Sequence, residues 1–476
     1  MSSSSALHNS QFRIYFIASC FATMAVWMIR FLFGWLIWQQ TESFFWVGVA
    51  STSLMLPALI ITPVFGVISD RINLKRGMIY WLACQSAVTL LAICLLGFWP
   101  LSLSLLLSLT LAFGVIAAAG SPLRLTLIPK LVSPDELSNA VGLGAMVFNS
   151  ARIVAPAVSA WCLTFMGPIG VLALGCLAFL AAGGLNMLLA DHYSVSRRPA
   201  SDVPNNDLSN NDLSSNNLSN NDLQNNNLPN NNLSTNNLST NNLPTNNLST
   251  NNLPNNDLPS TNGWQEFIAG LRFSWSNPVI RLICALTLIN SQVARSLMEL
   301  LPALSGLFTA GTATDLATLT AFAGGGSILG GWFMSTLGRD TQRLVRVLIG
   351  AMLLTSVAIL PLLFALSIWP MSISIGLISL LMTLLGTGSQ ILLQRQTLDA
   401  MRGRVLSLWI TIAIAGPALG ALMMGAIAEF LGFPVMLALM LILSLLSTAW
   451  LSHRRELIYD RPLSADPLTS TTHTAT

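Results

Sequence analysis

The stretch "GMIYWLACQSAVTLLAICLLGFWPLSLSLLLSLTLAFGVIAAAG", residues 77–120, contains no charged side chain along its whole length. A helix needs about 20 apolar residues to cross the hydrocarbon core of a bilayer. The short break "GFWPL" separates two runs of that length and carries no Lys or Arg. The stretch therefore predicts two membrane-spanning helices joined by a short loop outside the bilayer.

The composition of the whole chain extends this prediction. Of the 476 residues, 53% are hydrophobic and only 9% are charged, and the mean hydropathy is +0.65. Soluble proteins carry about a quarter charged residues, so the composition excludes an ordinary soluble protein. In hydrocarbon the backbone groups must pair within each segment, which helices achieve. The net charge of +3 is too small and dispersed to suggest nucleic acid as a partner.

Further apolar runs of similar length predict an all-α membrane protein with twelve transmembrane helices in two pseudo-symmetric six-helix bundles. The expected spans are residues 14–38, 46–68, 78–98, 101–121, 138–162, 167–190, 279–303, 314–336, 344–365, 369–392, 404–428 and 432–452. The domain prediction is an N-terminal bundle (1–190), a low-complexity linker (191–263), a C-terminal bundle with a leading interfacial helix (264–455) and a tail (456–476).

The positions of Lys and Arg predict how the chain is oriented. They gather at the chain ends, beside the linker and in every second loop, whereas the alternate loops, such as "QQTESFFW" and "SIWP", carry none. Because cytoplasmic loops carry the excess of Lys and Arg, both termini and the linker are predicted to be cytoplasmic. We expect a multi-pass protein of the cell (inner) membrane that acts as a monomer.

The linker repeats a five-residue unit of the type "STNNL" eleven times. One interpretation is a disordered tether, because one Leu in five cannot bury enough surface to offset the entropy lost on ordering. The period also resembles pentapeptide-repeat proteins, which coil into a β-helix. The following "WQEFIAGLRFSW", residues 264–275, predicts a short amphipathic helix on the inner membrane surface.

Cysteine and histidine usage argues against a metal centre, a cofactor and an enzyme. The six cysteines stand singly in apolar segments, and the four histidines lie in the tails, at the linker border and beyond the last span. No ligand spacing and no nucleophile–base pair appears within the predicted spans.

One loop between predicted spans carries a motif. It reads "GVISDRINLKRG", with Gly66, then Asp70 and Arg71, then Lys75 and Arg76. This pattern resembles the signature loop of the major facilitator superfamily, except that Leu occupies the first of its three basic positions. The resemblance implies a conformational latch. In it Gly66 permits close helix approach and Asp70 accepts hydrogen bonds from the arginine and from a neighbouring helix N-terminus.

Two longer stretches, residues 127–161 and 392–429, resemble the enterobactin-exporter-like branch of that superfamily, which exports siderophores or drugs. The first contains Asn149 and Arg152 in the branch's Asn-x-Ala-Arg pattern, although alanine stands where glycine is usual and an extra residue precedes proline. The second contains its Arg-Gly-Arg-Val. The resemblance covers both predicted bundles and excludes the linker.

Internal repetition relates the embedded charges of the two halves. Arg30 and Arg295 are 265 residues apart, and Pro156 recurs 261 residues later as Pro417. Glu299 follows one helical turn after Arg295 and is the only carboxylate deep inside a predicted span. The resemblance places the first and seventh spans face to face across a central cavity. We therefore expect Glu299 to be shared between the two arginines.

Three roles for these charges remain open. They form a static ion cluster, or Glu299 is the proton-coupling group, or the arginines bind an anionic substrate. Arg152 and Asn149 either pack helices together or line the cavity. The function expected is proton-coupled export of a small siderophore- or drug-like solute. The alternatives are an uptake permease of the same fold and a non-transporting membrane sensor or scaffold.

Overall fold

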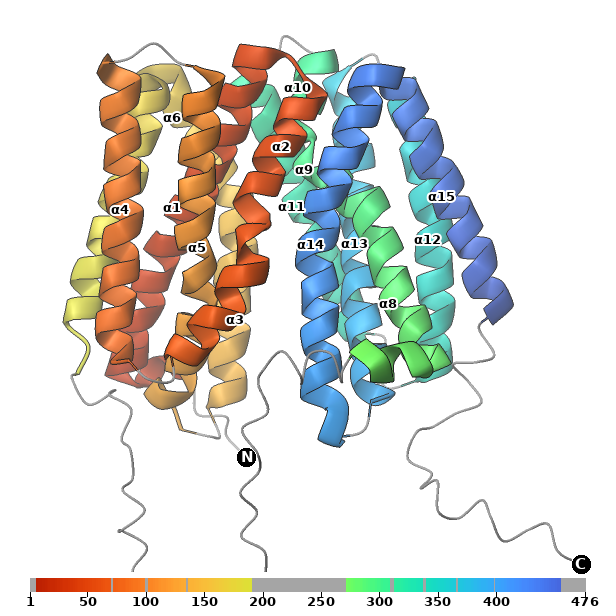
Figure 1. The fold of residues 1–476 in the computed structure, drawn as a ribbon, viewed down its shortest axis with the longest axis horizontal. Helices are drawn as coiled ribbons and strands as arrows, with labels where there is room; N and C mark the ends of the chain where they lie inside the picture. The colour runs from red at the N-terminus through yellow and green to blue at the C-terminus, as the bar shows by residue number, and fades with distance from the viewer. Residues whose placement is uncertain are drawn as a thin grey trace, which may run out of the picture. The chain divides into compact units, whose positions relative to one another are not determined.

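The computed structural model describes residues 6–69, 72–98, 102–133, 136–190, 271–308, 312–336, 340–364, 367–397 and 399–454. Within these ranges every regular element is a helix. Figure 1 shows the helices of the N-terminal half standing beside those of the C-terminal half, and the contacts join both halves into one compact unit. The linker and the C-terminal tail lie outside the described residues.

The N-terminal half begins with a short 3-10 turn, Ala6–His8, and Asn9 caps the first long helix by accepting hydrogen bonds from two backbone N–H groups. Its helices are α1 (Ser10–Thr41), α2 (Phe44–Met55), α3 (Pro57–Ser69), α4 (Leu74–Phe98), α5 (Leu103–Leu131) and α6 (Leu137–Met187).

The C-terminal half begins with helical residues 271–276, the described part of the predicted amphipathic segment. Its elements are α8 (Pro278–Asn290), the π-helix η2 (Ser291–Arg295), α9 (Ser296–Glu299), α10 (Leu301–Phe308), α11 (Ala313–Thr336), α12 (Thr341–Leu363), α13 (Ile368–Arg395), α14 (Asp399–Leu431) and α15 (Phe433–Arg454).

Helices of the described residues lie at all twelve predicted spans, although four of these spans do not match single helices. Among the described residues, ten helical stretches are long and apolar enough to cross a membrane. One of them, α6, contains two spans, because Gly167 turns the chain with a φ of 64°. The second predicted span divides before Pro57 into α2 and α3, and the seventh is the interrupted run from α8 to α10. The prediction of an all-helical membrane protein is confirmed for the described residues.

The helix ends define two sides of the protein. We call the side where α1 begins and α15 ends the terminal side, at the bottom of Figure 1, and the opposite side the distal side. The described helix ends on the terminal side carry basic residues, among them Arg13, Lys130 and Arg454. The distal ends carry Glu42 and Glu429, and no Lys or Arg occurs among their described residues.

The outer faces of the bundles are apolar, as contact with lipid requires. Leu90 of α4, Leu177 of α6, Ile373 of α13 and Leu446 of α15 are 50–65% exposed. The same helices bury other apolar residues between them. This arrangement reverses the surface of a soluble protein and agrees with a hydrocarbon environment.

The predicted latch is described only in part. Gly66 lies within α3, which continues to Ser69. Lys75 and Arg76 lie in the first turn of α4, where the Arg76 N–H donates to Asn73 at 3.1 Å. Asp70 and Arg71 fall outside the described residues.

The end of the fourth predicted span, residues 101–121, is corrected, because that bound had left Arg124 in the loop after it. The structure extends α5 to Leu131, so Arg124 lies inside the helix. Its guanidinium lies 5.2 Å from the Trp81 ring and donates to the Gly120 carbonyl at 3.2 Å. These contacts stabilise the cation, and no described carboxylate pairs with it.

Candidate functional site: a charged cavity between the two halves

The seventh span is interrupted where its charges lie. The expected continuous helix over residues 279–303 is replaced by a π-helix at 291–295, a single α-turn at 296–299 and a bend at Leu300. The Ser296 hydroxyl donates to the Gln292 carbonyl, and Pro302 carries no N–H for the Met298 carbonyl. Both features weaken the regular backbone hydrogen bonding within the helix. π-Helical turns are frequent at functional sites.

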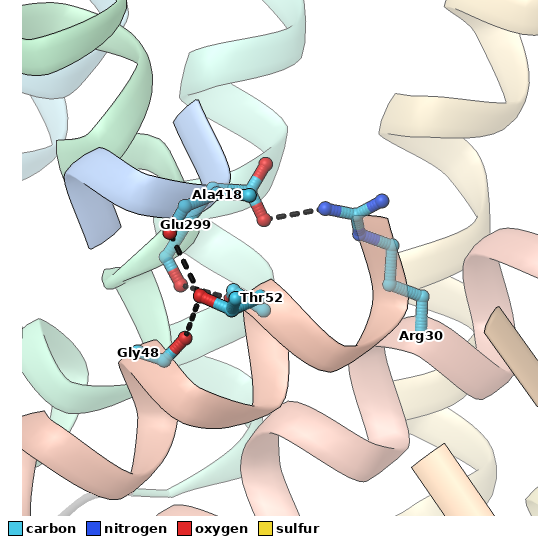
Figure 2. A network of polar contacts seen from close by, with 6 residues as sticks. Arg30, Gly48, Thr52, Glu299 and Ala418 are labelled. Atoms are coloured by element: carbon cyan, nitrogen blue, oxygen red, sulfur yellow. Dashed lines mark hydrogen bonds and ion pairs between the residues drawn. The ribbon is translucent and has the colours of Figure 1, made fainter. Parts of the chain in front are cut away.

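An ion pair joins the two halves at this interruption. The Arg30 guanidinium of α1 donates to a carboxylate oxygen of Glu299 in α9, as Figure 2 shows. The side chains of Arg30 and Glu299 are only 21% and 17% exposed. The Ser51 hydroxyl of α2 donates to the backbone carbonyl of Glu299 at 3.3 Å. Two helices of the first half therefore hold one turn of the second half.

Arg295 differs from the prediction that both arginines share Glu299. Among the described residues, Glu299 forms an ion pair with Arg30 alone. Arg295 instead donates to the Ala413 carbonyl of α14 at 3.2 Å. The physical reason is Pro417, which has no N–H and leaves the Ala413 carbonyl without its usual helical donor.

Arg152 of α6 lies in the same region without an ion pair among the described residues. Its guanidinium carbon lies 5.8 Å from the centre of the Trp27 ring, and that of Arg30 lies 5.3 Å from it. Trp27 also packs edge-on against Phe148, with 5.5 Å between the ring centroids. Asn149 lies on α6 one turn before Arg152, and its side chain is outside the described part.

Two adjoining cavities border these charges. The smaller, of about 90 Å³, is lined by residues that include Arg30, Arg152 and Glu299. The larger, of about 1050 Å³, is lined by residues that include Arg152, Arg295 and Glu299. Trp27 borders both. The predicted residues of the first and seventh spans and Arg152 thus line one continuous region between the halves.

On the distal side of this region the helices of the two halves are in close contact. A Cβ atom added to Gly48 of α2 would lie 2.5 Å from the Ala421 carbonyl of α14, and one at Gly425 would lie 2.5 Å from the Phe44 carbonyl. The Thr52 hydroxyl lies 2.8 Å from the Ala418 carbonyl (Figure 2). Glycine at these positions permits the close approach of α2 and α14.

The terminal side of the same region is open. A Cβ atom at Gly142 or Gly144 of α6, or at Gly331 of α11, would meet no atom within 4 Å. Gly142 and Gly331 line the larger cavity. The structure is therefore closed on the distal side and open on the terminal side.

Sequence reasoning missed two contributors to the site. Trp27 stands one turn before Arg30. This Trp-x-x-Arg spacing on an apolar helix indicates a cation–aromatic contact and could have identified Trp27. Glu429 of α14 accepts from the Phe44 N–H at the start of α2 at 3.1 Å. Nothing local in the sequence indicated that contact, because 385 residues separate its partners.

Comparisons with known families agree with the fold. A model described as the Major Facilitator Superfamily matches residues 15–353, and one described as a transmembrane secretion effector matches residues 247–471. The Staphyloferrin A transporter of Staphylococcus aureus (strain NCTC 8325 / PS 47) is 22% identical over 188 residues, 39% of this chain and 47% of that protein. The chain thus spans about half the length of that relative.

Solved structures resemble the whole chain at low sequence identity. The nucleoside transporter NupG (D323A mutant) is similar with a TM-score of 0.64 and 10% identity, over 93% of this chain and 99% of that one. A bacterial homologue of the human lysosomal transporter Spinster, inward-facing and unoccupied, is similar with a TM-score of 0.59 and 13% identity, over 96% and 99%. At these identities the likeness concerns the fold alone.

Proposed function

The chain belongs to the major facilitator superfamily, and from this premise we propose that it exports a small organic solute in exchange for protons. The observation that carries the proposal is the ion pair between Arg30 and Glu299, which bridges the halves beside a cavity open to one side. Alternating access requires a contact between the halves that can form and break. A carboxylate that either pairs or takes up a proton supplies such a contact.

We assign the coupling role to Glu299. Charged side chains at bilayer depth cost at least about 2.5 kcal/mol each, so they persist where they pair or meet water. A proton on Glu299 removes the charge that holds Arg30. Pairing with Arg30 and carrying a proton are therefore alternative states of one carboxylate. In this proposal the first state accompanies the conformation closed on the distal side, and loss of the pair lets the halves rock.

The direction of transport is proposed as outward. Support comes from the likeness of residues 127–161 and 392–429 to the exporter branch and from the secretion-effector match over residues 247–471. The similarity to a siderophore transporter supports a siderophore-like solute. With both termini in the cytoplasm, the terminal side is cytoplasmic and the larger cavity opens inward. The alternatives remain an uptake permease and a sensor whose linker is the working part.

The test uses cells that make the wild-type chain, Glu299→Gln or the matched control Asp315→Asn, which neutralises a carboxylate at the distal end of α11. Mass spectrometry of the medium and the cells, with and without a protonophore, measures which solutes change. We expect at least one solute enriched in the medium by the wild type and the control. That enrichment should be lost with Glu299→Gln and with the protonophore.

Other outcomes decide against the proposal. Protonophore-sensitive export that persists in Glu299→Gln would exclude Glu299 as the coupling carboxylate. Depletion of a solute from the medium would indicate uptake. No difference in any solute, together with a phenotype that depends on residues 204–260, would favour the sensor.

A further inference from the structure

Resting on the proposed function, we propose that the cavity binds an organic anion on Arg152 and Arg295, beside the ion pair of Arg30 with Glu299. The substrate class is then a solute with at least one carboxylate, phosphate or sulfonate group attached to an apolar body. The inference starts from an imbalance of charge in the lining of the two cavities.

Three arginines face one carboxylate there. Arg30, Arg152 and Arg295 line one or both cavities, and Glu299 is the only acidic residue in the lining that the structure describes. The ion pair neutralises Arg30 and leaves two positive charges in excess. Low-dielectric walls strengthen the field of such charges, so an anion is attracted and a cation is repelled.

Arg152 is the principal binding group in this proposal. It lines both cavities, no carboxylate among the described residues pairs with it, and its guanidinium stands beside Trp27. A guanidinium has five N–H donors in a planar fork that matches the two oxygens of a carboxylate. The indole holds the cation in place without using those donors.

Arg295 is positioned as the second group. One of its nitrogens is fixed by the Ala413 carbonyl, which leaves the other donors of the fork for the cavity. A Cβ atom at Gly386 would lie 3.3 Å from another nitrogen of the same guanidinium, so Gly386 leaves room beside it. The backbone of α13 and α14 thereby preorganises the cation, which lowers the entropy lost on binding.

The rest of the larger cavity suits an apolar body. Its lining includes Trp27, Phe148, Met146, Met298 and Met382. Methionine side chains are unbranched and polarizable, and they adapt to varied apolar shapes. The volume of about 1050 Å³ accommodates a drug-sized molecule.

The test measures charge preference with three aromatic probes of similar shape. These are 2-naphthoate, 2-naphthamide and (2-naphthylmethyl)trimethylammonium, added to the purified full chain in lipid nanodiscs, with empty nanodiscs as background. We expect naphthoate to bind about tenfold more tightly than the amide, and the cation to bind most weakly. The preference should vanish in Arg152→Gln and persist in Arg152→Lys.

Two further variants complete the test. Arg281→Gln removes an exposed arginine at the start of α8 and should leave the preference unchanged. Glu299→Gln frees Arg30 and should tighten naphthoate binding severalfold. The proposal is overturned if the amide or the cation binds as tightly as naphthoate, if Arg152→Gln keeps the preference, or if naphthoate fails to bind up to its solubility limit.

These outcomes separate the two proposals, because binding in nanodiscs involves no transport. If the cavity shows no preference for anions but the protein still exports a solute in exchange for protons, only the anion site is contradicted. If the cavity prefers anions but transport does not depend on the proton gradient, only the proposed proton coupling is contradicted.

Discussion

At the scale of single residues, the partner of each embedded charge determines the arrangement of the site. Arg30 forms an ion pair with Glu299 across the interface, whereas Arg295 donates a hydrogen bond to a backbone carbonyl in its own half. The two arginines occupy equivalent positions in the repeat, so the difference comes from their surroundings. Only the second half has a carboxylate one turn after its arginine. Only in the second half does the structure show the arginine donating to a backbone carbonyl, which belongs to α14, the helix that contains Gly416 and Pro417.

The first prediction concerns the coupling of Arg30 and Glu299. Either Arg30→Gln or Glu299→Gln should lower the free energy of unfolding by about 1–3 kcal/mol, because each leaves a largely buried charge without its partner. The double variant should lose less than the sum of the two, because it leaves no unpaired charge. Denaturation of the purified protein in micelles measures all three, with Arg281→Gln as the control. Additive losses would show that the pair contributes nothing of its own.

At the scale of elements, the distal closure depends on helices that touch through glycine. The backbones of α2 and α14 approach so closely that Gly48 and Gly425 have no room for a methyl group, whereas Gly331 of α11 borders open space. Alanine adds the same methyl group at each of these positions. A difference between their effects on conformation therefore shows on which side of the cavity the helices are in close contact.

The second prediction follows from this contrast. Gly48→Ala should force α2 away from α14 and shift the protein toward the conformation open on the distal side, whereas Gly331→Ala should not. The reporter is Thr387→Cys in the larger cavity, in a background whose six native cysteines are replaced by serine. Its rate of labelling by a hydrophilic maleimide should fall severalfold with Gly48→Ala alone. Equal rates in the two variants would contradict this assignment of the closed side.

At the scale of the whole molecule, the basic helix ends on the terminal side are the basis for orientation. On the positive-inside rule, we propose that this side faces the cytoplasm. Ser102 and Ser133 lie at opposite ends of α5 and are both exposed, so they offer a matched pair of positions.

The third prediction uses this pair. In intact cells a membrane-impermeant maleimide should label Ser102→Cys, on the distal side, and spare Ser133→Cys until the membrane is broken. The reverse pattern would invert the orientation and with it the direction in which the larger cavity opens.

The fourth prediction concerns the linker. Deleting residues 204–260 should leave both the thermal stability and the export activity unchanged, because the described helices of both halves pack on one another without it. The entropic cost of closing a loop grows only slowly with its length. A Gly/Ser segment of equal length is the control. Loss of function with both the deletion and this replacement would assign a specific role to the repeat.

The sequence by itself determined the all-helical membrane fold, and its resemblance to the superfamily predicted the meeting of Arg30 with Glu299. Hydrophobic length identifies a membrane span whatever its neighbours are, and the repeat offset relates equivalent positions. Only the tertiary structure decided the break in the seventh span, the attachment of Arg295 to Ala413 and the side on which the cavity opens. Each of these depends on which backbone groups and side chains approach from other helices, and no local pattern encodes that.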